Sequence, residues 1–163
     1  MPKIEQKQVV INEIREKLLK AKSAVLVDAR GLTVEQDTVL RRRLREADVD
    51  YKVYKNTMMN LAVEDTPFVG LRDYLSGPST LALSFDEDTT AARVINREIK
   101  AMPKLEFKAG IIGSVLYDSA GVATIANIPP KAELLAKLLG SFKSPMSSFA
   151  RVINAVAEQK AEA

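Results

Sequence analysis

The chain has 163 residues, which is long enough for one domain of ordinary size with an appendage. It contains no cysteine and no histidine, so disulfides, thiol nucleophiles and histidine-based acid–base catalysis are excluded, and most transition-metal sites lose their usual ligands. No apolar run approaches the roughly 18 residues of a membrane span, and the N-terminal segment is polar. We therefore expect a cytoplasmic protein with no membrane partner.

Positive charge is concentrated in the first third of the chain. Residues 1–60 carry 13 Lys and Arg against 9 Asp and Glu, whereas residues 61–128 carry 6 against 9 and residues 129–163 carry 5 against 3. The formal net charge of the whole chain is +3. Such an uneven distribution favours a polyanionic partner for the first third.

Helical and extended patterns alternate along residues 1–128. Helical periodicity and capping patterns predict helices at 3–22, 33–47, 58–63, 88–100 and 122–127, with a further short helix after Pro67. Thr33 and Gln36 have the spacing of a capping box, which sets the start of the second helix. Apolar or alternating runs predict strands at 23–28, 51–55, 79–85 and 105–111, and residues 114–117 extend or pair with the last one. The expected fold is α/β, a sandwich of helices on a small, mostly parallel or mixed sheet.

A right-handed crossover through 33–47 would make strands 23–28 and 51–55 parallel, with their C-terminal ends at one edge of the sheet. The turns that follow them would then lie within one or two strand spacings, each roughly 5 Å. Both turns lead into helix N-termini, which favour phosphate. The candidate RNA-binding residues at this edge, with two lysines of the first helix that would extend it, are Lys3, Lys7, Arg30, Gly31, Lys55, Asn56 and Thr57.

Each part of this surface also has a purely structural interpretation. The run Arg41-Arg42-Arg43 is typical of a solvated helix face, and Asn56-Thr57 is typical of a helix cap. The convergence of cations, a glycine and side-chain donors at one edge is what favours nucleic-acid binding.

The last segment has the pattern of a separate arm. Pro129 and Pro130 precede a helical run over 131–142, and Pro145 precedes a second one, so we expect a hinge, a helix, a break and a final helix. The apolar stripe of the final helix consists of Met146, Phe149, Ala150, Ile153, Val156 and Ala157. Since exposed side chains of this kind are an aggregation hazard, the stripe is expected to dock, either back on its own globular domain or on a partner. The double-proline hinge and the complete pattern of the preceding domain favour a partner. We divide the chain into a globular domain, 1–128, and a helical arm, 129–163.

Enzyme motifs are missing from the sequence. It has no G-x-x-x-x-G-K-[ST], no G-x-G-x-x-G, no H-E-x-x-H and no G-x-S-x-G. Asp28 ends a strand as a phosphotransfer aspartate would, but Ala29 and Arg30 follow it instead of a second carboxylate. We expect no catalytic residue, no cofactor and no metal.

Four motifs in order carry a family resemblance. They are VLVDxRGLT at 25–33, VYKNTM at 53–58, LSGPST at 75–80 and IPPKxELL at 128–135. In this order, over essentially the whole chain, they resemble the bacterial stalk-base protein of the large ribosomal subunit, the tenth protein of that subunit.

The resemblance implies a function. Members of that family bind the GTPase-associated region of large-subunit ribosomal RNA through a globular domain, beside the eleventh large-subunit protein. Their C-terminal helix carries dimers of the acidic stalk protein, which recruit translational GTPases. Arg30, Gly31, Lys55, Asn56 and Thr57 match the RNA-facing motifs of the family, whereas Lys3 and Lys7 match only in character. At about ten residues for each dimer, the segment 146–163 has room for two.

Two other functions remain open at this stage. The arm would make the protein a homodimeric RNA-binding regulator if it formed a coiled coil, although two heptads are short for one. Alternatively, the protein is a protein–protein adaptor whose basic face is only solvated. The resemblance favours a stalk anchor that is not a homo-oligomer.

Overall fold

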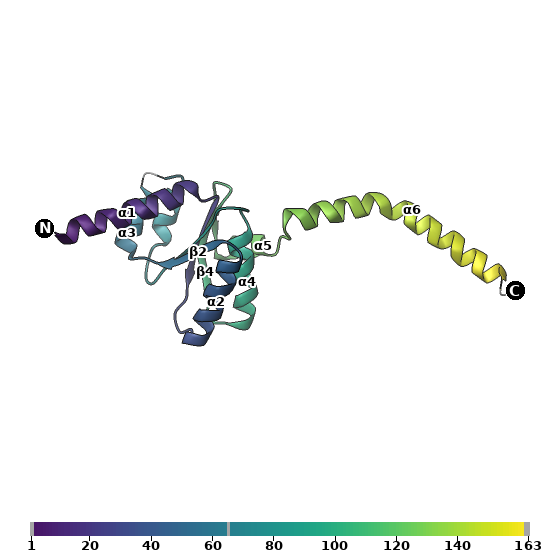
Figure 1. Ribbon diagram of the computed structural model, residues 1–163, viewed down its shortest axis with the longest axis horizontal. Coiled ribbons are helices and arrows are strands. Elements are labelled where there is room, and N and C mark those ends of the chain that lie inside the picture. Colours follow the sequence, from purple (N-terminus) through teal and green to yellow (C-terminus); the bar gives the residue numbers. More distant parts are fainter. Residues whose placement is uncertain (1, 65, 162–163) are drawn as a thin grey trace. The chain divides into compact units, whose positions relative to one another are not determined.

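The computed structural model describes the backbone of residues 2–64 and 66–161, and the side chains of residues 7–64 and 66–159 (Figure 1). The helices are α1 (Pro2–Lys20), α2 (Val34–Glu46), α3 (Asn56–Val63), α4 (Thr90–Ala101), α5 (Ser119–Ala126) and α6 (Lys131–Ala161), with a 3₁₀ helix η1 at Val69–Tyr74. The strands are β1 (Ser23–Asp28), β2 (Val49–Val53), β3 (Thr80–Ser84), β4 (Glu106–Ile112) and β5 (Val115–Asp118). The chain divides into two compact units, Met1–Ile128 and Pro129–Ala163.

The five strands form one sheet in the order β2-β3-β1-β4-β5. The α/β class is confirmed. All four neighbouring pairs are antiparallel, so the expectation of a mostly parallel or mixed sheet is wrong. The reason is that β3, which comes later in the chain, lies between β1 and β2 and runs against both.

The predicted relation between β1 and β2 is nevertheless confirmed. Since each is antiparallel to β3, β1 and β2 are parallel to one another. Val27 and Val53 both pair with Thr80, one on each side of β3. The C-terminal ends of the two strands therefore lie at the same end of the sheet, two strand spacings or about 10 Å apart.

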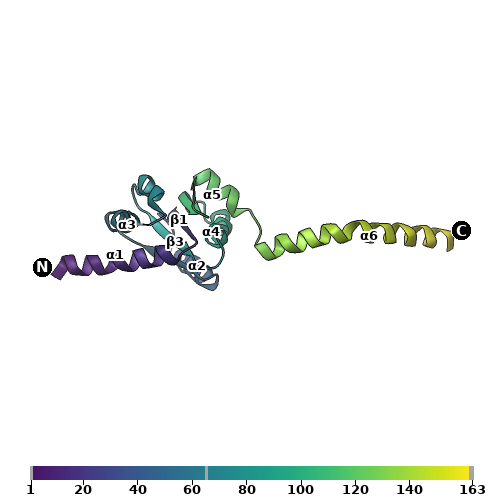
Figure 2. The ribbon, with the colours of Figure 1, turned by 90° about the horizontal axis from the view of Figure 1, so that it is seen from above.

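Helices cover both faces of the sheet. The alternating side chains of β1 divide between two cores: Ala24 and Leu26 pack with α1, α3 and η1, whereas Val25 and Val27 pack with α2, α4 and α5. Figures 1 and 2 both show α1 beside α3 and α4 beside α5. All six residues of β1 are buried, as expected for a strand with a neighbour on each side and a helical layer on each face.

The start of α2 follows the sequence prediction. Thr33 is the N-cap residue; its hydroxyl accepts a hydrogen bond from the backbone N–H of Gln36, and the Gln36 side chain accepts one from the backbone N–H of Thr33. Both arms of the predicted capping box are thus present. Strand β2 begins two residues earlier than predicted, directly after Asp48, whose φ of 53° turns the chain out of α2.

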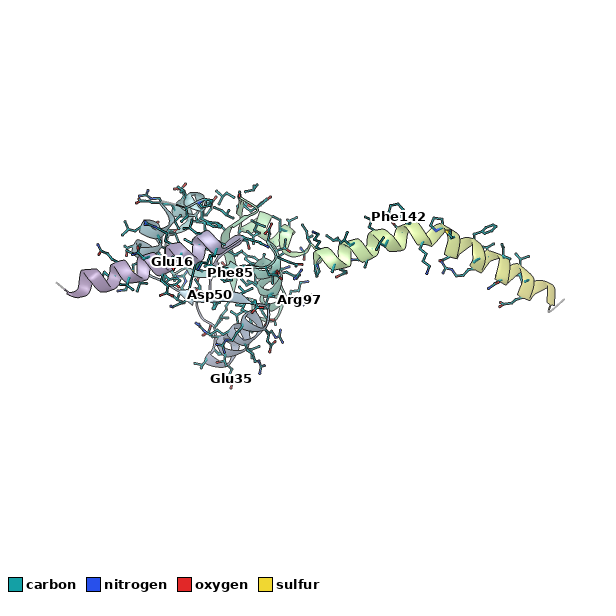
Figure 3. All side chains as sticks on the ribbon, turned by 45° about the horizontal axis from the view of Figure 1, so that its top comes forward. Glu16, Glu35, Asp50, Phe85, Arg97 and Phe142 are labelled. Atoms are coloured by element: carbon teal, nitrogen blue, oxygen red, sulfur yellow. The ribbon has the colours of Figure 1, made fainter. Side chains whose placement is uncertain are left out.

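The C-terminal unit differs from its prediction in one respect. Helix α6 continues through Pro145, so the predicted break between two helices is wrong. Pro145 has no N–H to donate to the carbonyl of Ser141, and its ring crowds that carbonyl, but in an exposed helix water can satisfy the carbonyl while the helix bends. The axis of α6 curves instead, and Figure 3 shows Phe142 projecting where the direction of the axis changes.

None of the helices in the described part of the chain is long and apolar enough to cross a bilayer. The described residues likewise contain no cluster of acidic side chains that would hold a metal ion.

Loss of the capping box is expected to weaken the globular unit. Thr33→Ala removes the hydroxyl that accepts from the backbone N–H of Gln36, so the free energy of unfolding should fall by about 1 kcal/mol. Thr38→Ala is the matched control: the Thr38 hydroxyl bonds to the carbonyl of Val34 within the exposed helix, and alanine is the better helix former. Denaturant unfolding followed by far-ultraviolet circular dichroism measures both. Equal losses in the two variants would contradict the role of the cap.

Candidate nucleic-acid interface

The sheet end where β1 and β2 finish is hollowed. A cavity of about 760 Å³, which we call the strand-end hollow, is bordered by the turn after β1, the first half of α2, the β2–α3 junction and the loop before β3. Four of the predicted RNA-binding residues border it: Arg30, Lys55, Asn56 and Thr57. Side chains from positions 30 and 55–57 are thus brought together as the sequence predicted.

Arg30 is held by a salt bridge at the end of β1. Its Nε lies 3.0 Å and its Nη2 2.8 Å from Oδ2 of Asp28, and its backbone N–H donates to Asp28 Oδ1 at 3.1 Å. The Asp28 side chain is 12% exposed and that of Arg30 is 72% exposed. The pair therefore anchors the guanidinium while leaving most of it accessible to a ligand.

Opposing effects act on the Asp28 carboxyl. Burial raises its pKa, but hydrogen bonds from the Arg30 side chain and backbone, with the charges of Arg30 and Lys108, outweigh burial and hold the pKa below its usual value. Hydrogen bonding to the same carboxylate raises the pKa of Arg30. Asp28 is thus an ionised structural anchor, and its partner is a cation instead of the second carboxylate that a magnesium site would need.

Gly31 adopts a φ of +75°, a backbone conformation that is unfavourable for residues with a Cβ atom. A Cβ at this position would lie 3.1 Å from Cδ of Lys104, a flexible side chain that can move. The backbone conformation, more than the space, therefore requires glycine. Lys104, from the α4–β4 connection, lies against Gly31 and adds a cation that the sequence analysis did not identify.

Asn56 and Lys108 hold the loop before β3. Asn56 Nδ2 donates to the carbonyl of Gly77 at 2.5 Å. The amine of Lys108 donates to the carbonyls of Ser76 at 2.7 Å and Pro78 at 2.5 Å. Three successive carbonyls are thus fixed by side chains from α3 and β4, so Asn56 has a structural role in addition to any contact with RNA.

Lys108 reaches this loop because it occupies a bulge. Leu26 pairs with Ala109 and Val27 with Phe107, so Lys108 is the extra residue of β4. Strand periodicity placed Lys108 on β4. The register shift that directs its amine arises from the pairing of β4 with β1 and has no local sequence signal.

Lys55 and Thr57 are exposed at the start of α3, and Lys55 has no salt bridge among the described residues. Lys55 is the N-cap residue without a side-chain cap, so the first backbone N–H groups of α3 remain available. Lys7 is exposed on α1 but does not border the strand-end hollow. The side chain of Lys3 lies outside the described residues.

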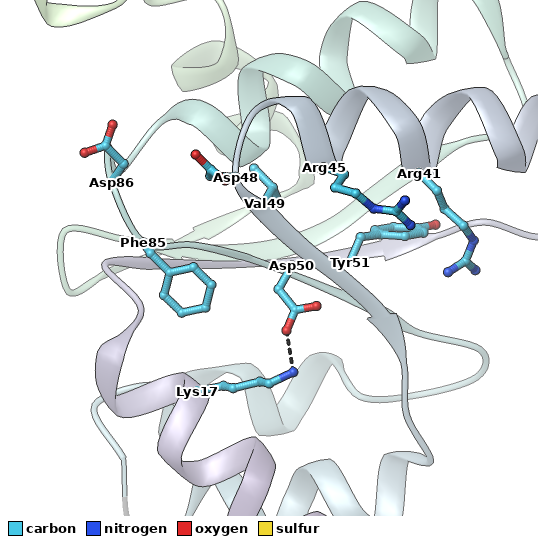
Figure 4. A pocket seen from close by; sticks show the side chains of 9 residues that line it. All are labelled: Lys17, Arg41, Arg45, Asp48, Val49, Asp50, Tyr51, Phe85 and Asp86. Carbon is cyan, nitrogen blue, oxygen red and sulfur yellow. Dashed lines mark hydrogen bonds and ion pairs between the residues drawn. The ribbon is translucent and has the colours of Figure 1, made fainter.

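A second hollow lies along the outer edge of β2, between α1 and α2 (Figure 4). It has a volume of about 840 Å³ and contains three cations and three carboxylates, among them the ion pair of Lys17 with Asp50 at 2.7 Å. The strand-end hollow has three cations and only one carboxylate, Asp37, which is paired with Arg41. Charge therefore favours the strand-end hollow for a polyanion.

Family comparisons agree with this arrangement. A family model described as "Ribosomal protein L10" matches residues 2–100, and a second, "Ribosomal protein uL10 C-terminal region", matches residues 128–163.

The chain belongs to the ribosomal protein L10 family.

Three relatives named large ribosomal subunit protein uL10 illustrate the similarity. The chain is 46% identical to that of Finegoldia magna, covering 98% of this chain and 88% of the relative, and 44% identical to that of Clostridium tetani, covering 94% and 90%. It is 43% identical to that of Bacillus licheniformis, covering 98% and 96%. The resemblance is confirmed, and L10 proteins are structural components of the large ribosomal subunit, not enzymes.

The Asp28–Arg30 ion pair should make the stability of the protein depend on pH. Asp28→Asn should lower stability at neutral pH, because the carboxylate that accepts from Arg30 is lost. Since the folded-state pKa of Asp28 is below its ordinary 3.8, its contribution is present above that value and is lost as the pH falls through the folded-state pKa. The stability difference between wild type and variant should thus close in acid. Asp73→Asn, at an exposed aspartate, is the control. A pH-independent difference would contradict the ionic role of Asp28.

Proposed function

We propose that this L10-family chain forms the base of the ribosomal stalk. In this proposal the globular unit binds the GTPase-associated region of large-subunit ribosomal RNA, beside the eleventh large-subunit protein. The arm anchors dimers of the acidic stalk protein that recruit translational GTPases.

The proposed RNA binding is supported by the strand-end hollow. Arg30 and Lys55 stand at the ends of two parallel strands, about 10 Å apart by strand spacing, and Lys104 and Lys108 lie beside the same turns. Fixed turns, free N–H groups at the start of α3 and exposed cations suit contact with the backbone of a folded RNA.

The proposed role of the arm is supported by the exposure of its apolar side chains. In the arm, large apolar side chains are exposed from Leu134 to Val156, including Met146 at 75%, Phe149 at 69% and Ile153 at 50%. Each such side chain gains roughly 1.5–3 kcal/mol on burial, so a long exposed stripe favours a partner. A helix that lays this stripe in a groove is a common mode of protein recognition.

The stripe is longer than the sequence analysis predicted. It includes Leu134, Leu135, Leu138, Leu139 and Phe142, ahead of Met146. We retain two stalk dimers on residues 146–163, and Met146, Phe149, Ala150, Ile153, Val156 and Ala157 are their proposed contacts. A longer stripe also lengthens the coiled-coil surface of the homodimer alternative, which sedimentation of the chain alone tests; a dimer would contradict the stalk-anchor proposal.

RNA binding should depend on a contact between Lys55 and a phosphate of the RNA. Lys55→Gln should weaken binding to a transcript of the GTPase-associated region and reduce the slope of log K against log salt by about 1, since one phosphate contact is lost. Lys20→Gln is the control, because Lys20 ends α1 just before β1 begins and so lies at the opposite end of the sheet. Filter binding across salt concentrations measures both variants. An equal change in the two variants would show that binding responds only to net charge.

Stalk docking should depend on the apolar stripe. Phe149→Ala should weaken binding of the acidic stalk protein at least tenfold, as expected for loss of a large buried anchor. Ser144→Ala changes the opposite side of the same helix and should leave affinity unchanged. Native mass spectrometry should count four stalk copies on the wild type. Six copies would contradict the proposal of two dimers and would make residues 131–142 a further site.

A further inference from the structure

The strand-end hollow has features that a surface contacting only phosphate does not need. Its volume of about 760 Å³ is within the range of roughly 300–1,000 Å³ of pockets that hold small organic groups. Two aliphatic side chains at its border are unusually open: Val34 is 84% exposed and Val53 is 58% exposed. Phosphate gains nothing from such apolar surface, whereas the flat face of a nucleobase does.

A buried hydroxyl without a partner lies at the base of the same hollow. Tyr51 is 9% exposed, and its hydroxyl has no hydrogen-bond partner among the described residues. The Thr80 hydroxyl is close enough to lower the pKa of Tyr51, but the two do not have hydrogen-bond geometry. Buried hydroxyls normally have a partner, so an unpaired one that borders a hollow is available to a polar group of a ligand.

The orientation of Tyr51 is set by Arg41. The Arg41 guanidinium lies 5.3 Å from the centre of the ring and is fixed by a hydrogen bond of 2.8 Å to Asp37. Figure 4 shows the Tyr51 hydroxyl directed toward Arg41 and away from Phe85 and Asp86, and Arg41, Asp37 and Thr80 all border the strand-end hollow. Tyr51 and Arg41 border the hollow along the β2 edge as well, whereas Asp37 and Thr80, the side chains that act on the hydroxyl, border only the strand-end hollow of the two. The hydroxyl end of the ring therefore lies at the strand-end hollow.

Burial raises the pKa of the Tyr51 hydroxyl, and so does the charge of Asp37. The hydroxyl thus keeps its proton at neutral pH and can both donate and accept a hydrogen bond. The edge of a nucleobase carries donors and acceptors of this kind, and unpaired bases are what proteins read in RNA.

We propose that the strand-end hollow receives one unstacked base of the RNA, with the Tyr51 hydroxyl bonded to its edge, Val34 and Val53 against its face, and Arg30 and Lys55 on the flanking phosphates. This inference rests on the proposed RNA-binding function and deepens it. Recognition then requires a nucleotide that is turned out of the helix, and contact with backbone shape alone is not sufficient.

Tyr51→Phe tests the proposal with little risk to the fold, since the hydroxyl it removes has no partner in the described structure. The matched control is Tyr117→Phe. Tyr117 lies on β5, at the opposite edge of the sheet from β2, packs against the core of α2, α4 and α5, and does not border the strand-end hollow. Tyr54, whose hydroxyl is also buried and unpartnered, borders the same hollow and therefore cannot serve as the control.

The full chain is mixed with a transcript of the GTPase-associated region, and two footprints are recorded. Dimethyl sulfate and carbodiimide report base edges, and hydroxyl radicals report the backbone. Wild type should protect at least one unpaired base edge. Tyr51→Phe should expose that base again and weaken binding roughly 3- to 10-fold, the loss expected for one neutral hydrogen bond, with an unchanged salt slope. Tyr117→Phe should do neither, and Lys55→Gln should reduce the salt slope while the base stays protected.

The outcomes separate the two levels of the argument. A backbone footprint without protection of any unpaired base, or base protection that persists in Tyr51→Phe, would overturn the base-binding inference and leave RNA binding intact. A wild-type chain that gives no backbone footprint would overturn the proposed RNA-binding function itself.

Discussion

The position of β3 between β1 and β2 is the constraint on which the candidate interface depends. Because β1 and β2 are both antiparallel to β3, they run in the same direction, and because Val27 and Val53 both pair with Thr80, they finish at the same end of the sheet. The Arg30 turn and the Lys55 turn, 25 residues apart in the chain, become neighbours for this reason. Pairing of β1 directly with β2 would bring the turns closer and leave no loop between them, and the hollow between the turns would be lost.

Side-chain hydrogen bonds then fix the turns around that hollow. Asp28 holds Arg30, while Asn56 and Lys108 hold the carbonyls of the loop before β3. Most of these polar groups are hydrogen-bonded within the protein, so the shape of the surface is fixed in the absence of a ligand. In the proposed complex, preorganisation of this kind reduces the ordering cost of binding, and exposed groups such as Lys55 are the proposed contacts with the RNA.

The arm follows a different physical principle. Helix α6 has no layer of its own unit to cover its apolar stripe, and its proline curves the helix without ending it. The globular unit buries its aliphatic side chains on both faces of a sheet, whereas the arm exposes them along some two dozen residues, from Leu134 to Val156. The exposed stripe is the basis of the proposal that a partner covers the arm.

Sequence by itself determined the elements whose causes are local: the buried run of β1, the capping box of Thr33, the glycine required at Gly31 and the apolar stripe of the arm. The sequence also predicted that β1 and β2 are parallel, because a right-handed helical crossover is the general way in which two parallel strands of one sheet are connected. Only the tertiary structure decided that β3 separates them, that Lys108 bulges toward the loop, and that the Tyr51 hydroxyl faces a hollow. Strand order, register and cavities depend on contacts between distant segments, and no local pattern of residues encodes them.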